Sequence, residues 1–335
     1  MFSIATTDRS CPSIDTGSGQ DQNGRGPRPA RRGNSCRCPR SKAGRKRLPV
    51  CYCLWLPVSM PCFDWYWEAT DGTSLFFREC RPSGPPKALL CLVHGHGDHS
   101  GMYSQAMRQL AAAGFAVCAF DLRGHGRSEG PIGDAPSYEQ LLDDVGLLLS
   151  EAERRFAPDL PVFLFGHSHG GGLVLNYGLR RRPRLRGVIA TSPWLRLAFR
   201  LPPWMDVLAR FPHLVKPDYG VASRDERRLP DIVGGGRAKP RDELVHRTIT
   251  PRLFFASRDA GDWALRHAGE FPLPLLVVHG VQDRATSIDA SRRFVEMAPG
   301  DATFVPCQEL RHLIHVEGVE ENLFGIVSSW MESRV

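Results

Sequence analysis

The stretch that most constrains the fold is residues 161–172, where an apolar run leads into a Gly-x-Ser-x-Gly pattern centred on Ser168. The run 162–165 is typical of a buried strand, and the apolar spacing after the pattern predicts a helix. Strand, sharp turn and helix is the context in which this pattern presents a reactive serine. A Gly-rich turn with a structural serine is the plainer alternative. A nucleophilic Ser168 therefore requires a base, an acid and an oxyanion hole elsewhere in the chain.

Strand and helix patterns alternate from residue 63 to the end of the chain, after an aromatic-rich hairpin around Asp71-Gly72. The later strands are continuous apolar runs, as in strands covered by helices on both faces. This order predicts an α/β fold with a mostly parallel central sheet, an N-terminal antiparallel hairpin, helices on both faces and an inserted cap. The expected strands are 64–69, 74–80, 88–93, 115–120, 162–165, 187–191, 275–279 and 303–306, and the expected helices are 103–113, 138–156, 169–182, 288–297 and 320–331.

Two regions interrupt the alternation. Residues 1–59 are rich in Gly, Pro, Ser and Arg, which predicts a disordered leader, and we expect the folded protein to begin at Met60. Residues 194–268 hold many apolar residues and prolines without strand–helix alternation. We expect them to form a cap over the C-terminal edge of the sheet, with most of their apolar side chains packed on the core. The core is then 60–193 together with 269–335.

The net charge of +7 belongs to the leader, because residues 1–60 hold 11 Lys and Arg against 3 Asp and Glu, and the remainder holds 32 against 33. The body therefore gives no reason to expect a nucleic-acid partner. Apolar runs stay below the roughly 18 residues that a membrane-spanning helix requires. The ten cysteines are scattered, and we interpret them as small buried side chains in a reducing compartment, which favours a cytoplasmic location.

The loop after the third expected strand allows two interpretations. As His94-x-His96-x-Asp98-His99 it matches the zinc-ligand spacing of metallo-β-lactamase-type hydrolases. As a His-Gly loop it brings backbone N–H groups to a substrate carbonyl oxygen. Hydrolases with a Gly-x-Ser-x-Gly turn need such a loop at this place in the chain order, which favours the second interpretation.

The acid and the base are expected after the serine, in the order Asp and then His. Asp283 follows an expected strand directly and is the candidate acid, whereas Asp259 and Asp262 lie in the expected cap. His312 lies in the loop after the last expected strand and is the candidate base. His315 is nearer the terminal helix and is a candidate supporting partner.

Six motifs together resemble the monoacylglycerol lipase and lysophospholipase group of α/β-hydrolases, also described as serine-aminopeptidase-like, over about residues 64–332. The resemblance implies Ser168, Asp283 and His312 as a catalytic triad, and the backbone N–H groups of His96 and His169 as the oxyanion hole. The family usually has a small or apolar residue at 96, and often Met or Gln at 169, so these two imidazoles are expected to alter acyl or head-group preference. The motifs are 94–103, 121–130, 166–170, 191–193, 279–283 and 312–317.

These observations predict a serine hydrolase of carboxylic esters that works through an acyl-enzyme, with neither a metal nor an organic cofactor. Trp194, Leu197 and Trp204 of the cap are expected to bind a long acyl chain, as in a monoacylglycerol or lysophospholipid, and the cap to touch a lipid surface. The substrate is expected to be a small lipid ester. A peptidase, thioesterase or acyltransferase on the same triad, a zinc-dependent hydrolase using loop 94–99, and a binding module without turnover stay open.

Overall fold

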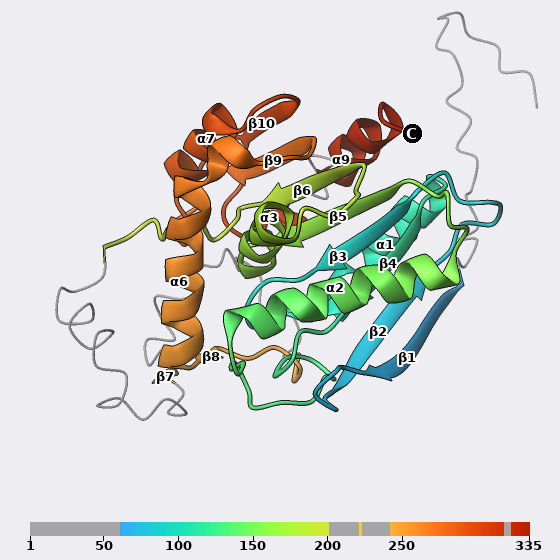
Figure 1. Cartoon of the computed structure of the whole chain (residues 1–335), viewed down its shortest axis with the longest axis horizontal. Coiled ribbons are helices and arrows are strands. Elements are labelled where there is room, and N and C mark those ends of the chain that lie inside the picture. Colours follow the sequence, from blue (N-terminus) through green and yellow to red (C-terminus); the bar gives the residue numbers. More distant parts are fainter. Residues whose placement is uncertain (1–60, 201–220, 223–241, 318–322) are drawn as a thin grey trace, which may run out of the picture. The chain divides into compact units, whose positions relative to one another are not determined.

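An eight-stranded sheet organises the part of the chain that the computed structural model describes, which is residues 61–200, 221–222, 242–317 and 323–335 (Figure 1). The expected leader 1–59 and Trp204 lie outside these residues. The strand order is β1-β2-β4-β3-β5-β6-β9-β10. The strands are β1 (Cys62–Glu68), β2 (Ser74–Cys80), β3 (Leu89–Val93), β4 (Ala116–Phe120), β5 (Val162–His167), β6 (Gly187–Thr191), β9 (Leu275–Gly280) and β10 (Ala302–Cys307).

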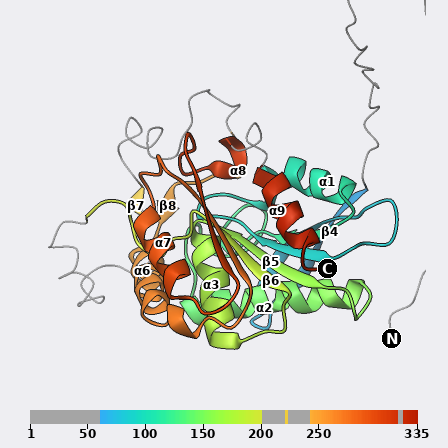
Figure 2. The same cartoon turned by 90° about the horizontal axis from the view of Figure 1, so that it is seen from above.

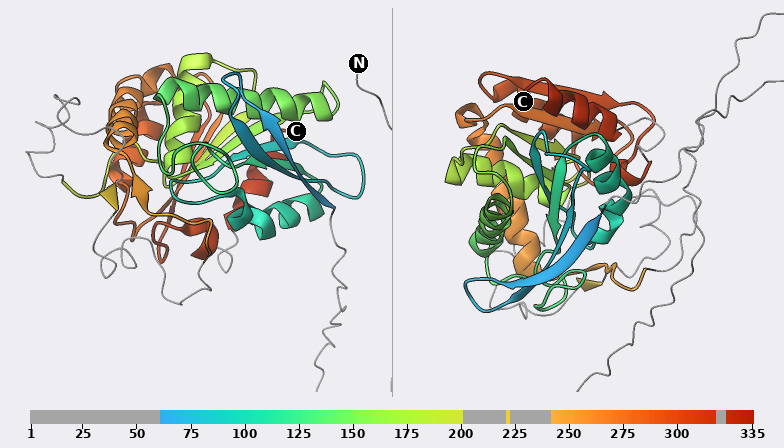
Figure 3. Two further views of the ribbon diagram at one scale, coloured as in Figure 1. Left: turned by 90° about the horizontal axis from the view of Figure 1, so that it is seen from below. Right: turned by 90° about the vertical axis from the view of Figure 1, so that its right-hand side faces the viewer.

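The antiparallel pairing is confined to one edge of this sheet. β1 pairs antiparallel with β2, and β2 pairs antiparallel with β4. The other strands of this sheet run parallel to β4, and they are β3, β5, β6, β9 and β10. Figure 3 shows the hairpin β1–β2 in blue and β10 in red at opposite edges. The parallel strands end at the same side of the sheet, so the loops that follow them share that side, as predicted.

Helices cover both faces, because alternate residues of each buried strand point to opposite sides. Leu89 and Cys91 of β3 belong to one hydrophobic cluster with residues of α2, α3, α6 and α7, whereas Leu90 and Leu92 belong to a second with residues of α1 and α9. Figures 1 and 2 show α2 and α3 on one face of the sheet and α1 and α9 on the other. The helices are α1 (Ser104–Ala112), α2 (Tyr138–Arg155), α3 (His169–Arg181), α6 (Pro251–Arg266), α7 (Ile288–Met297), α8 (Ile314–Glu317) and α9 (Leu323–Glu332), with short 3-10 turns at Ser100–Tyr103 and Ala268–Glu270.

Helix α6 lies within the expected cap 194–268. Its buried residues Leu253, Ala260, Ala264 and Leu265 belong to the same hydrophobic cluster as residues of α2 and α3. These apolar side chains recur at helical spacing. The short antiparallel pair β7 (Val221–Ala222) and β8 (Thr248–Ile249) precedes α6. Most of the remaining cap segment lies outside the described residues.

The cysteines differ in part from the expectation of free thiols. A disulfide joins Cys62 of β1 to Cys80 of β2, residues that are direct cross-strand neighbours. Cys91, Cys118 and Cys307 are buried, as expected of small apolar side chains. In the described part of the chain, no helix combines the length and the apolar character needed to cross a membrane.

Candidate active site

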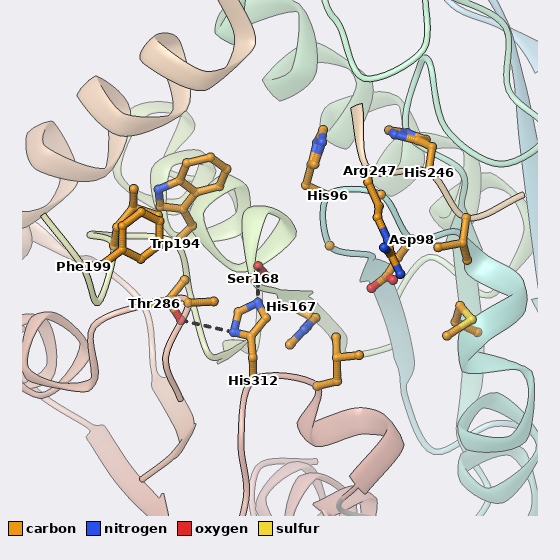
Figure 4. A pocket seen from close by; sticks show the side chains of 17 residues that line it. His96, Asp98, His167, Ser168, Trp194, Phe199, His246, Arg247, Thr286 and His312 are labelled. Atoms are coloured by element: carbon orange, nitrogen blue, oxygen red, sulfur yellow. Dashed lines mark hydrogen bonds between the residues drawn. The ribbon is translucent and has the colours of Figure 1, made fainter. Parts of the chain in front are cut away.

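Three side chains from distant parts of the sequence meet beyond the carboxyl ends of the parallel strands. Ser168 follows β5, Asp283 follows β9 and His312 follows β10. The Nε2 atom of His312 lies 2.9 Å from Oγ of Ser168 (Figure 4). Its Nδ1 atom lies 2.7 Å from Oδ2 of Asp283. The imidazole thus donates from Nδ1 to the carboxylate and accepts the serine proton at Nε2, which is the tautomer that a general base requires.

The turn at Ser168 is strained and held in place by its surroundings. Ser168 has φ 53° and ψ −114°, a conformation that is costly for a residue with a side chain. Its N–H donates to the Thr191 carbonyl at 2.9 Å, and its carbonyl accepts from Trp194 N–H at 2.8 Å. A Cβ on Gly166 would overlap the Gly170 carbonyl, and a Cβ on Gly170 would overlap the carbonyls of residues 93 and 94. Both glycines are therefore required by the close approach of β5, α3 and the loop after β3.

Both oxygens of the Asp283 carboxylate accept hydrogen bonds. Its Oδ1 accepts from the backbone N–H groups of Ala285 and Thr286 at 2.7 and 3.0 Å, and its Oδ2 accepts from the Thr286 hydroxyl at 2.8 Å. Nε2 of His279 lies 3.2 Å from the same Oδ2. Burial by itself would raise the pKa of Asp283, but hydrogen bonds from His279 and His312 outweigh it and hold that pKa well below its usual value. The group therefore stays ionised beside His312.

The loop after β3 passes directly against Ser168. A Cβ on Gly95 would lie 3.2 Å from Cβ of Ser168, and Gly95, His96 and Gly97 line the same cavity as Ser168. His169, the other expected oxyanion donor, is the first residue of α3, where backbone N–H groups point out of the helix end. The two predicted donors thus come from the segments that flank the serine hydroxyl.

The four residues of the zinc alternative do not form one ligand set among the described residues. Both ring nitrogens of His94 are engaged, with the Leu122 N–H at 2.8 Å and the Gly95 carbonyl at 2.7 Å. His99 accepts from the Gly101 N–H at 3.1 Å and contacts Asp242 at 3.0 Å. These bonds fix the loop to its neighbours, so this histidine-rich loop serves as a scaffold rather than as the ligand set that its spacing suggested.

A cavity of about 420 Å³ opens beside Ser168 and His312 (Figure 4). Trp194 and Leu197, two of the three expected cap contacts, line it, whereas Trp204 lies outside the described residues. The described wall is largely apolar and also includes Met102, Phe199, Val245 and Leu313. Such a wall suits an acyl chain better than a polar substrate.

Asp98 supplies a carboxyl group in the lining of this cavity. Burial raises the pKa of Asp98 to about 7, and the charge of His312 acts in the opposite direction. His315 lies behind it, with Nε2 at 3.9 Å from the carboxylate, and its ring stacks on Tyr103 with centroids 4.5 Å apart. His315 is thus buried close to the site without touching Ser168, in keeping with a supporting role.

The two competing candidates for the acid lie away from the triad. Two residues that contact Asp283 were not predicted. Asp259 and Asp262 are on α6, where they pair with Arg258 and Arg196. His279 and Thr286 contact the Asp283 carboxylate, but neither was a predicted site residue. Their proximity to Asp283 in the sequence was the available signal, since a turn after a strand brings residues three or four positions apart together.

Comparison with known families adds a second line of evidence. Residues 84–318 match the family described as serine aminopeptidase, S33. This range covers more than two thirds of the chain and contains Ser168, Asp283 and His312.

Three relatives with known sequences are similar over most of this chain. An uncharacterized abhydrolase domain-containing protein of Dictyostelium discoideum is 30% identical over 284 residues, which are 79% of this chain but only 28% of that protein. The monoacylglycerol lipase of Mycolicibacterium smegmatis is 28% identical over 79% of this chain and 95% of its own length. The human monoglyceride lipase is 29% identical over 83% of this chain and 93% of its own length.

Solved structures share the arrangement of strands and helices. A monoacylglycerol lipase of Paleococcus ferrophilus has a TM-score of 0.64 and 28% identity, covering 82% of this chain and all of that one. A soluble variant of the monoglyceride lipase of Saccharomyces cerevisiae, in complex with a substrate analogue, has a TM-score of 0.70 and 18% identity, covering 81% of this chain and 95% of that one. Together with the mostly parallel sheet, these matches confirm the predicted α/β-hydrolase fold.

Proposed function

The chain belongs to the serine aminopeptidase S33 family, and we propose that it hydrolyses carboxylic esters of lipids, with Ser168 as nucleophile, His312 as general base and Asp283 as the supporting acid. The observation that carries this proposal is the continuous hydrogen-bond chain from Ser168 through His312 to Asp283, with distances of 2.9 and 2.7 Å. Ser168 lies on a strained turn beside an apolar cavity, which is the position that a serine acyl-transfer site requires.

In the proposed reaction, Nε2 of His312 removes the Ser168 hydroxyl proton while Oγ attacks the ester carbonyl carbon. The backbone N–H groups of His96 and His169 donate to the oxyanion, and the positive end of α3 adds to this stabilisation. His312 then gives its proton to the leaving alcohol as the ester C–O bond breaks. Water, deprotonated by the same imidazole, attacks the acyl-enzyme, and the proton returns to Ser168 as the fatty acid leaves.

The lining of the cavity favours a monoacylglycerol or a lysophospholipid as the ester. Trp194, Leu197 and Phe199 offer an apolar wall for an acyl chain, and Asp98 offers a polar group for a small head group. We expect the segment 194–268 to contact lipid surfaces, although most of it lies outside the described residues. The substrates named for the relatives belong to the same class of ester.

The test combines covalent labelling with a substrate panel. A fluorophosphonate should label the wild-type chain once, and Ser168→Ala should abolish both the labelling and the hydrolysis of a p-nitrophenyl ester while the circular dichroism spectrum stays unchanged. The panel should contain monoacylglycerols of varied chain length, a lysophospholipid, an acyl thioester and an aminoacyl anilide. Faster turnover of the anilide or the thioester would assign the triad to a peptidase or thioesterase instead. Retained ester hydrolysis in Ser168→Ala would reject Ser168 as the nucleophile.

A further inference from the structure

We propose that His96, His125 and His246 form a binding site for a divalent transition-metal ion, best suited to zinc, beside the ester cavity and distinct from the triad. The three residues follow β3, follow β4 and precede β8, respectively. One potential ligand nitrogen from each lies within 4.8 Å of the other two. His96 and His246 also line the cavity, and Figure 4 shows them on the side away from His312.

The backbone fixes the tautomers of two of these rings. Nε2 of His96 lies 2.9 Å from the Thr248 carbonyl oxygen, and Nδ1 of His125 lies 3.0 Å from the Arg123 carbonyl oxygen. A carbonyl only accepts hydrogen bonds, so each of these nitrogens carries the ring proton. The remaining nitrogens, Nδ1 of His96 and Nε2 of His125, then carry lone pairs instead of protons, and they lie only 3.3 Å apart.

Two lone pairs at this distance repel unless a cation satisfies both. A proton is the first possibility, but each ring is buried beside other imidazoles, which disfavours a charged ring and lowers its pKa. The tautomers set by the backbone carbonyls leave the two lone pairs for a metal ion. Neutral imidazoles whose other nitrogen donates to a backbone carbonyl are the usual form of metal-binding histidines.

The separation between the ligand nitrogens of His96 and His125 suits zinc. Two nitrogens bound at about 2.0–2.1 Å to one tetrahedral zinc ion lie about 3.3–3.4 Å apart. The separation between His96 and His125 matches this edge of the tetrahedron. Three imidazoles with a fourth position left for water or another ligand form a common zinc environment, and copper and nickel accept the same donors.

His246 supplies the third donor. Both of its ring nitrogens are shielded from solvent, and neither makes a hydrogen bond of normal geometry with the described residues. Its ring centroid lies 4.4 Å from that of His125 and 5.3 Å from that of His96. Burial lowers the pKa of His246, and the nearby backbone groups of Thr248 and Gly124 act in the opposite direction.

The main chain holds His246 against the loop that carries His96. The His246 N–H donates to the Gly97 carbonyl at 3.1 Å, and a Cβ on Gly97 would overlap the His246 carbonyl oxygen. A metal ion at the three rings would therefore join the loop 94–99 to the segment 242–250. The consequence is a metal-dependent stiffening of the wall that carries the proposed oxyanion donor His96.

The test measures metal binding directly on the full chain, without relying on turnover. Metal-free wild-type protein should bind one more Co²⁺ per chain than His125→Asn, with the visible absorption of tetrahedral cobalt, and zinc should displace it. The asparagine amide can keep the bond to the Arg123 carbonyl while the Nε2 ligand is lost. His267→Asn is the matched control, because Nδ1 of His267 donates to the Trp263 carbonyl at 2.9 Å but is outside the cluster.

A second measurement guards against a misfolded variant. Zinc at about 100-fold excess over its Kd should raise the wild-type Tm by about 5 °C, and a chelator should reverse the rise. The shift should be lost in His246→Gln and kept in His267→Asn. Equal cobalt binding by the wild type, His125→Asn and His246→Gln would overturn the proposal. So would a wild-type Tm that does not respond to zinc.

Discussion

The Nε2 atom of His279 lies 3.2 Å from Oδ2 of Asp283, the carboxylate oxygen that also accepts from the proposed catalytic base. Nε2 of His279 also lies 3.3 Å from the Thr286 carbonyl oxygen, and because both neighbouring oxygens only accept, Nε2 carries the ring proton and donates. Nδ1 of His279 then accepts from the Ser291 hydroxyl at 2.9 Å. The proposed acid is therefore held by a buried imidazole from its own strand as well as by His312. This support for Asp283 leads to the first prediction.

Replacing His279 should destabilise the protein at neutral pH, and the loss should shrink as the pH falls below the unfolded-state pKa of Asp283. His279→Ala removes one of the bonds that depress the pKa of Asp283, so that pKa should rise towards its usual value. A carboxylate with a depressed pKa stabilises the fold above its unfolded-state value and loses that effect as pH falls through its folded-state value. The acid-unfolding midpoint, followed by circular dichroism, should therefore move to higher pH. His279→Gln, which keeps an N–H donor, should move it less, and equal midpoints for wild type and His279→Ala would contradict the assignment.

Asp283→Asn should lower kcat by about 10⁴-fold with little change in KM, because an amide favours the wrong tautomer of the base. Asp262→Asn is the matched control, since Asp262 pairs with Arg196 on α6, away from the triad. Steady-state kinetics on a soluble ester would measure both variants. A loss of less than tenfold in Asp283→Asn would show that another group orients His312.

Asp98 should make stability fall between about pH 4 and pH 7. Its folded-state pKa is raised from 3.8 to about 7, so the folded state binds the proton more tightly than the unfolded state in this interval. Stability from such a group is present below the unfolded-state pKa and is lost as pH rises to the folded-state pKa. In denaturant unfolding, the free energy of unfolding of Asp98→Asn should rise relative to that of the wild type from pH 4 to 7. Above pH 7 the difference between the two should stay constant. A difference independent of pH would refute a buried, protonated Asp98.

Gly166→Ala should lower the free energy of unfolding by about 3 kcal/mol or prevent folding, because the added methyl meets backbone atoms that cannot shift without moving α3. Gly84→Ala is the control, since a Cβ there would have no neighbour within 4 Å. Thermal unfolding of the two variants gives the comparison. Similar Tm values would show that β5 and α3 are not packed as closely at this turn as described.

The disulfide between β1 and β2 should stabilise the fold by about 3 kcal/mol, as expected for a loop of this size. It closes a sequence separation of 18 residues at the antiparallel edge of the sheet. A reductant should therefore lower the Tm of the wild type but not that of Cys62→Ala. Unchanged melting of the wild type under reduction would mean that these two thiols stay unpaired in solution.

The parallel core was predictable because its strands are continuous apolar runs bounded by polar turns. The strand Gly187–Thr191 and the helix Ile288–Met297 have the bounds that the sequence predicted. The meeting of the three triad residues was also predictable, since parallel strands deliver the residues that follow them to one edge. The catalytic roles of these residues stay proposals until the variants are measured.

The features that were missed depend on contacts between segments whose pairing the sequence does not specify. Helix α6 was not among the expected helices, because its apolar spacing alone does not reveal which helices its buried face meets. The Cys62–Cys80 disulfide depends on the register of β1 against β2. The cluster of His96, His125 and His246 requires three separate loops to meet, and only the first of these residues belonged to a predicted zinc motif.

The order of the strands has a consequence for biosynthesis. The serine turn lies in the middle of the chain, whereas β9 and β10, which precede the proposed acid and base, come near its end. The segment that carries the proposed nucleophile is therefore synthesised well before the proposed acid and base, which lie in the last fifth of the chain. Under the proposed mechanism, Ser168 has no general base until His312 has been synthesised and the last strand has joined the sheet.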